Sequence, residues 1–105
     1  MSEEIWPAVR AARAWLDAAN GTESAELTCR ILKVTEEAGE AAAAWIGVLG
    51  QNPRKGVTHG PADVAAELAD VAITALVAIE SLGLDARRAL TDRARLVLAR
   101  TRSGS

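Results

Sequence analysis

The chain has 105 residues, half of them hydrophobic, and a formal net charge of −2 at pH 7. This length suits one domain with a modest core, so we expect a single domain over residues 1–105. The near-neutral charge excludes the basic footprint of a nucleic-acid-binding domain, so no nucleic acid is expected as a partner. No stretch is long and apolar enough to predict a membrane span.

The residue types narrow the class of protein further. Cys29 is the only cysteine, which excludes an intramolecular disulfide and a thiolate metal site. The acidic N-terminal residues lack a signal-peptide pattern, and we therefore expect a cytoplasmic protein. Three tryptophans are the only aromatic residues. A core made mainly of alanine and aliphatic side chains buries little area per residue, so we expect assembly into a dimer or tetramer.

The first predicted helix covers about 2–19. Ser2 is a suitable N-cap, and Gly21 is a strong stop signal. Pro7 belongs in a first helical turn, which moves the expected start toward Ile5.

Three more helices are predicted, over about 24–49, 61–81 and 85–102. The second can begin at Thr22 instead. A glycine-rich loop, 50–60, separates the second helix from the third, and loops of this length are often functional. The sequence predicts an all-α fold, a four-helix bundle-like protomer.

The second helix combines an apolar and a polar stripe. Gly39 interrupts it at a cost of up to about 1 kcal/mol relative to Ala. We therefore expect another helix or a ligand to approach closely there. The apolar stripe contains Leu27, Ile31, Val34, Ala38, Ala41, Trp45 and Val48, and the polar stripe contains Glu26, Arg30, Lys33, Glu37 and Glu40.

Two acidic clusters lie within otherwise apolar helical segments. Glu36, Glu37 and Glu40 form the first, and Glu67 and Asp70 form the second. Residues three apart share a helix face, so two facing helices bring four or more carboxylates together. Such a cluster fits a hard cation such as Mg²⁺, held against the phosphates of a substrate.

The distribution of charge favours this interpretation over a plain solvated surface. No lysine or arginine occurs in 36–49 or in 57–84. Desolvating unpaired carboxylates costs several kcal/mol each, which a cation offsets. The alternative stays open, because like charges on an exposed helix cost only ~0.2–0.5 kcal/mol per pair.

The pattern Glu36-Glu37-x-x-Glu40 followed by Glu67-x-x-Asp70 resembles the MazG-like nucleotide pyrophosphohydrolases of the all-α NTP pyrophosphatase superfamily. The resemblance covers about residues 24–100. It implies hydrolysis of the α–β phosphoanhydride of a nucleoside triphosphate, giving a monophosphate and pyrophosphate. It also implies a requirement for Mg²⁺, with Mn²⁺ as a substitute, and a homodimer or homotetramer.

The resemblance further implies a role for each acidic residue. Glu37, Glu40, Glu67 and Asp70 match the metal-binding positions. Glu36 matches the remaining acidic position and, with Glu37, is expected to orient or deprotonate the attacking water.

Cations and aromatic residues complete the expected site. Candidate phosphate-binding residues are Lys33, Lys55, Arg93 and Arg100, with Arg54 as a further loop candidate. Val97 stands where related enzymes carry Asn, which departs from the pattern. Trp15 or Trp45 can stack on the base, although both also suit a core. A solvated helix end equally explains the arginines of the last helix.

Two other functional classes remain open. A helical interaction module would use the acidic stripes to bind a basic partner or to seal an oligomer. A family member without turnover would bind the nucleotide and not cleave it.

Overall fold

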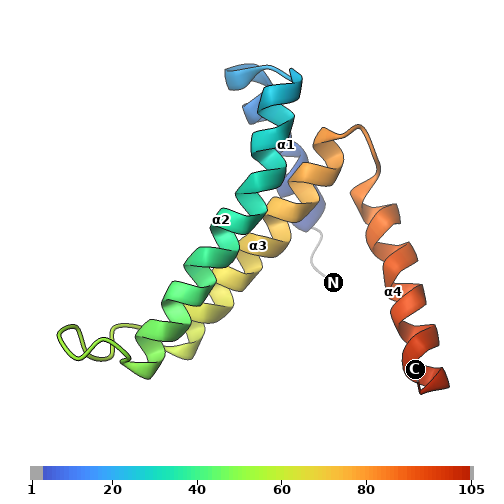
Figure 1. The fold of residues 1–105 in the computed structure, drawn as a ribbon. Helices are drawn as coiled ribbons and strands as arrows, with labels where there is room; N and C mark the ends of the chain where they lie inside the picture. Colours follow the sequence, from blue (N-terminus) through green and yellow to red (C-terminus); the bar gives the residue numbers. More distant parts are fainter. Residues whose placement is uncertain (1–3, 105) are drawn as a thin grey trace.

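The computed structural model describes residues 4–104, which form four α-helices. They are α1 (Ile5–Asn20), α2 (Ser24–Leu49), α3 (Pro61–Ser81) and α4 (Ala86–Ser103), arranged as in Figure 1. The all-α prediction is confirmed, and residues 4–104 contain no strand. The predicted Ser2 cap lies outside the described residues.

Local side-chain chemistry explains where the helices begin and end. At the start of α3 the Gly60 N–H donates to the Asp63 carboxylate at 2.8 Å. At the start of α4 the Asp85 carboxylate accepts from the Arg88 N–H at 3.1 Å. Both bonds satisfy donors that the first helical turn leaves without partners. Helix α2 ends at Gly50, whose φ of 64° is a left-handed conformation that favours glycine.

Helices α2 and α3 form a long antiparallel hairpin that the 50–60 loop closes at one end, and α1 packs across the other end, where α2 begins and α3 ends (Figure 1). The core lies where α1, the C-terminal half of α3 and the start of α4 meet. It contains Trp6, Val9, Leu76, Val77 and Ala86. The rest of α4 diverges from the hairpin, so the bundle-like protomer is open on one side.

The open arrangement makes the protomer extended. Its radius of gyration is 16.7 Å and its principal extents are 46 × 45 × 26 Å. A compact domain of this length has a radius of gyration of about 13 Å. Within residues 4–104, no helix is long and apolar enough to cross a membrane.

Arg30 joins three helices and is the most buried charged residue described, with 5% of its surface exposed. Its guanidinium donates to Glu26 at 2.8 Å, to Asp17 at 2.7 Å and to the Ser81 hydroxyl at 3.1 Å. A fourth bond reaches the Gly21 carbonyl at 2.9 Å. Arg30 thus belongs to the predicted polar stripe of α2, and it is buried between the helices instead of facing solvent.

The loop between α2 and α3 folds back onto the end of α2. The Thr58 N–H donates to the Gly47 carbonyl at 3.0 Å, and the Thr58 hydroxyl lies 2.8 Å from His59 Nδ1. A Cβ atom at Gly47 would lie 2.2 Å from His59 Nδ1 and 2.5 Å from Thr58 Oγ1. The close approach is thus at Gly47 and not at Gly39, where a Cβ would meet nothing within 4 Å.

Replacing Gly47 with Ala is expected to destabilise the protein by about 1–2 kcal/mol, because the new methyl group collides with the docked loop. In a Thr58→Ala/His59→Ala background the same change should be neutral or stabilising, since alanine favours the helix by up to about 1 kcal/mol. Urea unfolding followed by circular dichroism measures both effects. Equal stabilisation in the two backgrounds would show that the loop does not dock.

Candidate functional site

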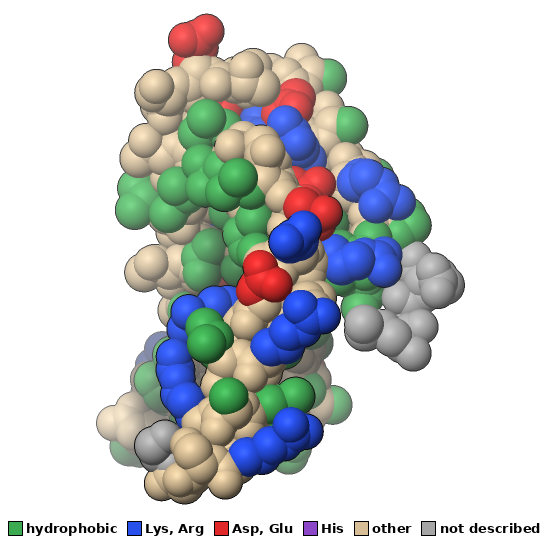
Figure 2. Space-filling view, turned by 90° about the vertical axis from the view of Figure 1, so that its right-hand side faces the viewer, with side chains coloured by type: hydrophobic (Ala, Val, Ile, Leu, Met, Phe, Trp, Pro, Cys, Tyr) green, Lys and Arg blue, Asp and Glu red, His purple; other side chains and the backbone are tan. Residues whose placement is uncertain are grey.

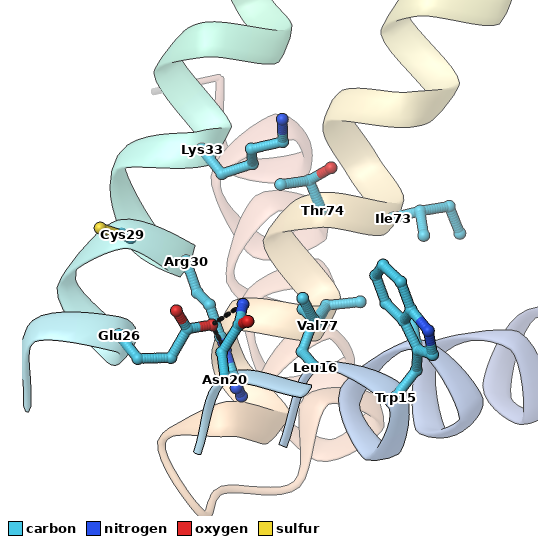
Figure 3. A pocket seen from close by; sticks show the side chains of 11 residues that line it. Trp15, Leu16, Asn20, Glu26, Cys29, Arg30, Lys33, Ile73, Thr74 and Val77 are labelled. Carbon is cyan, nitrogen blue, oxygen red and sulfur yellow. Dashed lines mark hydrogen bonds and ion pairs between the residues drawn. The ribbon is translucent and has the colours of Figure 1, made fainter. Parts of the chain in front are cut away.

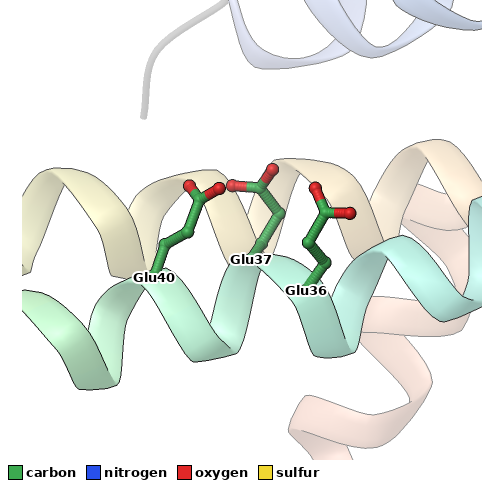
Figure 4. A group of neighbouring side chains, drawn as sticks. All are labelled: Glu36, Glu37 and Glu40. Atoms are coloured by element: carbon green, nitrogen blue, oxygen red, sulfur yellow. The ribbon is translucent and has the colours of Figure 1, made fainter.

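Three glutamates lie side by side along α2 at the middle of the hairpin. One carboxylate oxygen from each of Glu36, Glu37 and Glu40 lies within 4.8 Å of the others (Figure 4). Their spacing produces this arrangement, because residues three or four apart project from the same side of a helix.

Helix α3 adds two more carboxylates to the same place. Oxygen atoms of Glu37, Glu67 and Asp70 also lie within 4.8 Å of one another. Glu37 belongs to both groups and is half-buried, as is Glu67. The structure therefore brings together all five acidic residues that the sequence singles out, which we call the carboxylate cluster.

Glu67 is the residue whose surroundings most favour a cation. Its Oε2 atom is buried from solvent and accepts no hydrogen bond from any described residue. An unsatisfied buried acceptor costs about 1–3 kcal/mol, and more when it is charged. Residues 4–104 provide no ion pair to Glu40, Glu67 or Asp70. The inner part of the cluster is thus an anionic site without a protein cation.

Lys33 is the one described cation that touches the cluster. Its ammonium donates to the Glu36 carboxylate and lies 3.7 Å from Glu37. The hydrogen bond to Glu36 is the main cause that raises the pKa of Lys33. The ammonium is half-exposed, so a phosphate has access to it.

A cavity of about 380 Å³ lies beside the cluster, between α1, α2 and α3 (Figure 3). Lys33 and Thr74 line the edge nearest the cluster, one helical turn from Glu37 and Asp70 respectively. Its walls are otherwise mainly apolar, formed by Ala12, Trp15, Leu16, Cys29, Ile73 and Val77. Asn20, Glu26 and Arg30 line the edge away from the cluster. A mainly apolar cavity with polar groups at its edges suits a small organic ligand.

The two candidate base-stacking tryptophans lie in different places. Trp15 lines the cavity and is 69% exposed. Trp45 lies farther along α2, outside the cavity, and is 50% exposed. Neither belongs to the core, whose only tryptophan is Trp6. Only Trp15 is therefore placed to contact a ligand in this cavity.

The other predicted phosphate-binding cations are not brought to the cluster within one chain. Lys55 lies in the loop, while Arg93 and Arg100 lie on the diverging α4. Figure 2 views the molecule from the α4 side and shows basic side chains along that helix with hydrophobic ones between them. Arg87 stacks on Trp6, with 4.9 Å from the guanidinium carbon to the ring centroid.

The donor set fits a hard divalent cation. Carboxylate oxygens at this density, with an orphaned buried oxygen among them, match the ligands that Mg²⁺ takes in proteins. Magnesium usually keeps several waters and is completed by substrate phosphates, so a half-exposed cluster suits it. The cavity on one side leaves room for the rest of such a substrate.

Sequence reasoning missed two features of this region: the cavity and the Arg30 network below it. A cavity depends on how three helices pack, which no local pattern encodes. The sequence does contain one signal of the network: Glu26 lies four residues before Arg30 on the same helix, a spacing that favours an ion pair. Comparison with protein-family models, with characterised proteins and with solved structures finds no match to this chain.

Proposed function

We propose that the protein is a Mg²⁺-dependent nucleoside triphosphate pyrophosphohydrolase, acting on cytoplasmic nucleotides. The observation that carries the proposal is the five-carboxylate cluster containing the unpartnered buried Glu67 oxygen. The adjoining cavity supports a ligand with an anionic and an apolar end. The resemblance of the acidic motif to the MazG-like enzymes supplies the reaction class.

In this proposal Glu37, Glu40, Glu67 and Asp70 hold the cation, which neutralises phosphate charge and acidifies bound water when present. A water molecule adds to a phosphorus of the α–β bridge, and the bond from that phosphorus to the bridging oxygen breaks. The water proton passes to a carboxylate, Glu36 or Glu37. Monophosphate and pyrophosphate are the products.

The remaining residues position the substrate. Lys33 contacts a phosphate from the edge of the cavity, because its ammonium is the cation nearest the cluster. Trp15 offers a ring face to the base inside the cavity. Phosphoryl transfer depends mainly on such positioning and on charge neutralisation, and less on an unusual nucleophile.

The proposal is tested with a panel of ribo- and deoxynucleoside triphosphates, measuring pyrophosphate and phosphate separately. We expect pyrophosphate release that requires Mg²⁺ or Mn²⁺, is abolished by a chelator, and is lost in Glu40→Ala. Release of phosphate instead would contradict cleavage at the α–β bond. No turnover of any member, with Glu40→Ala behaving like the wild type, would contradict the enzyme.

A second measurement separates catalysis from binding alone. An analogue with a methylene group in place of the α–β bridging oxygen should bind in the presence of Mg²⁺, as measured by calorimetry. Binding of the analogue without turnover of the natural nucleotide would indicate a nucleotide-binding protein. Absence of both would favour the helical interaction module.

A further inference from the structure

A second cavity, of about 420 Å³, lies between α1, the turn that follows α3 and the first turn of α4. Its wall is mainly polar and contains three arginines, Arg10, Arg13 and Arg87. Glu80, also on the wall, lies ten residues after Asp70 on α3, which is about 15 Å along the helix. This cavity is therefore separate from the carboxylate cluster, and it shares no described lining residue with the cavity beside the cluster.

The two carboxylates on the wall of this second cavity are already engaged with α4. Glu80 accepts a hydrogen bond from the Ala86 N–H at 2.7 Å, and Asp85 accepts one from the Arg88 N–H at 3.1 Å. Both bonds satisfy donors that the first turn of α4 leaves without partners. Within residues 4–104, neither carboxylate forms an ion pair.

The three arginines are thus left with little negative charge around them. Among the described residues, Arg10 has no hydrogen bond or ion pair, and the contact of Arg87 is with the Trp6 ring. Arg13 pairs with Asp17 at 3.4 Å, but this carboxylate also holds a closer, buried arginine. An anion inside the cavity would supply the missing charge.

The placement of the arginines suits a ligand held from two sides. Arg10 and Arg13 lie three residues apart, so they project from one side of α1, and Arg87 belongs to α4. Helix α4 contains six arginines against one acidic residue, and Figure 2 shows basic side chains along it. Such a field attracts anions, and the planar guanidinium group matches the oxygens of a phosphate in bidentate geometry.

The same cavity offers no surface for a nucleotide base. Its only aromatic residue, Trp6, is 8% exposed, and Arg87 lies over its ring. The wall favours a compact, strongly charged ligand over one with an apolar part. We infer that this cavity binds a small polyanion with two or more phosphate groups, held between the arginines of α1 and Arg87 of α4.

A ligand in this position would fix the orientation of α4. The helix diverges from the hairpin and is anchored by its first turn, after a joining turn in which Gly83 has a φ of 82° (Figure 1). Phosphates that contact both α1 and Arg87 bridge this joint. Binding here does not depend on the proposed hydrolysis, because the cavity lies away from the carboxylate cluster and needs no metal.

Calorimetry with pyrophosphate tests the inference, at low ionic strength and with a chelator present. We expect a Kd below about 1 mM for the wild type. Arg10→Gln and Arg87→Gln should each weaken binding by about 10-fold, since each removes a charge-assisted contact. Arg88→Gln is the matched control: it removes the same charge from the neighbouring position, and Arg88 is 80% exposed and lies outside the cavity. It should leave the Kd unchanged.

Two further measurements accompany the titrations. Circular dichroism checks the fold of Arg87→Gln, which loses the contact with Trp6, whereas Arg10→Gln has no described contact to lose. Tripolyphosphate and a nucleoside triphosphate should bind equally well. A tighter nucleoside triphosphate whose binding still needs Arg10 would support the same site and identify its ligand as the phosphate tail of a nucleotide.

Hydrogen exchange locates the ligand independently. Pyrophosphate should slow the exchange of backbone amides in 83–90, where α4 joins the rest of the molecule. Slowing confined to the region around Lys33 and Thr74, at the other cavity, would overturn the inference. So would an equal loss of affinity in Arg88→Gln and Arg10→Gln, or no binding to the wild type up to about 10 mM pyrophosphate.

Discussion

Replacing Glu67 with Gln is expected to lower kcat/KM for Mg²⁺-dependent pyrophosphate release by about 100-fold or more. The amide keeps the size of the side chain and removes the charge that would hold the cation. Glu67 is the critical member because its Oε2 atom is buried and has no partner among the described residues. Initial rates over a range of Mg²⁺ concentrations measure the effect.

The same substitution should have the opposite effect on the stability of the metal-free protein. Removing the charge from a half-buried carboxylate whose Oε2 atom has no partner is expected to raise the free energy of unfolding by about 1 kcal/mol. In the wild type, Mg²⁺ at about 100 times its Kd should add about 2.7 kcal/mol, and this gain should disappear in Glu67→Gln. Thermal melts with and without Mg²⁺ distinguish these effects.

Glu23→Gln is the matched control for Glu67→Gln. Glu23 lies at the start of α2, is exposed and makes no side-chain capping bond. Its replacement should change neither the rate nor the response to Mg²⁺. An equal Mg²⁺ stabilisation in the wild type and in Glu67→Gln would show that the cation binds elsewhere.

Replacing Arg30 with Met is expected to destabilise the fold by about 3 kcal/mol, the lower end of the range for breaking a buried ion pair. The side chain of Arg30 is 4% exposed and its partner Asp17 is 30% exposed, so Asp17 regains some water when the guanidinium is lost. Arg30 also bonds Ser81 and Gly21, which ties α3 and the α1–α2 turn to α2.

Arg13→Met is the corresponding control. Arg13 pairs with the same carboxylate at 3.4 Å, and its side chain is 36% exposed. An exposed pair of this kind contributes less than about 1 kcal/mol. Urea unfolding at one fixed protein concentration compares the two variants. If both substitutions lowered the free energy of unfolding equally, the Arg30 network would be no stronger than a surface ion pair.

The network also predicts how stability depends on pH. The hydrogen bond from Arg30 is the main cause that lowers the pKa of Glu26 below its ordinary value of 4.5. A carboxyl group with a lowered folded pKa stabilises the protein above its unfolded pKa. This stabilisation is lost as pH falls through the folded pKa. Stability should therefore fall with acidification below about pH 4.5, and less steeply in Arg30→Met.

The sequence predicted the helices well because their signals are local. Gly21 and the 50–60 loop mark helix ends, and three-residue spacing places Glu67 with Asp70 on one side of α3. The lack of lysine and arginine near the acidic residues predicted that α2 and α3 face each other. The structure supports this prediction, because carboxylates of both helices lie together. The metal and the reaction stay predictions.

The features that the sequence did not predict depend on tertiary packing. Arg30 resembles a surface residue by type, and only the meeting of α1, α2 and α3 buries it. Helix α4 has a normal amphipathic pattern, yet only its first turn is anchored, by the buried Ala86 and its 2.7 Å bond to Glu80. Gly39 was expected to mark a close contact, and the contact is at Gly47.

The chain contains three tryptophans and no tyrosine or phenylalanine, so all of its intrinsic fluorescence comes from three separate positions. Trp6 lies in the core beneath the start of α4, Trp15 lines the cavity, and Trp45 lies on the open hairpin. Single-tryptophan variants therefore provide three independent spectroscopic probes. Emission and quenching at each one distinguish motion of the last helix, occupation of the cavity and covering of the hairpin, without any added label.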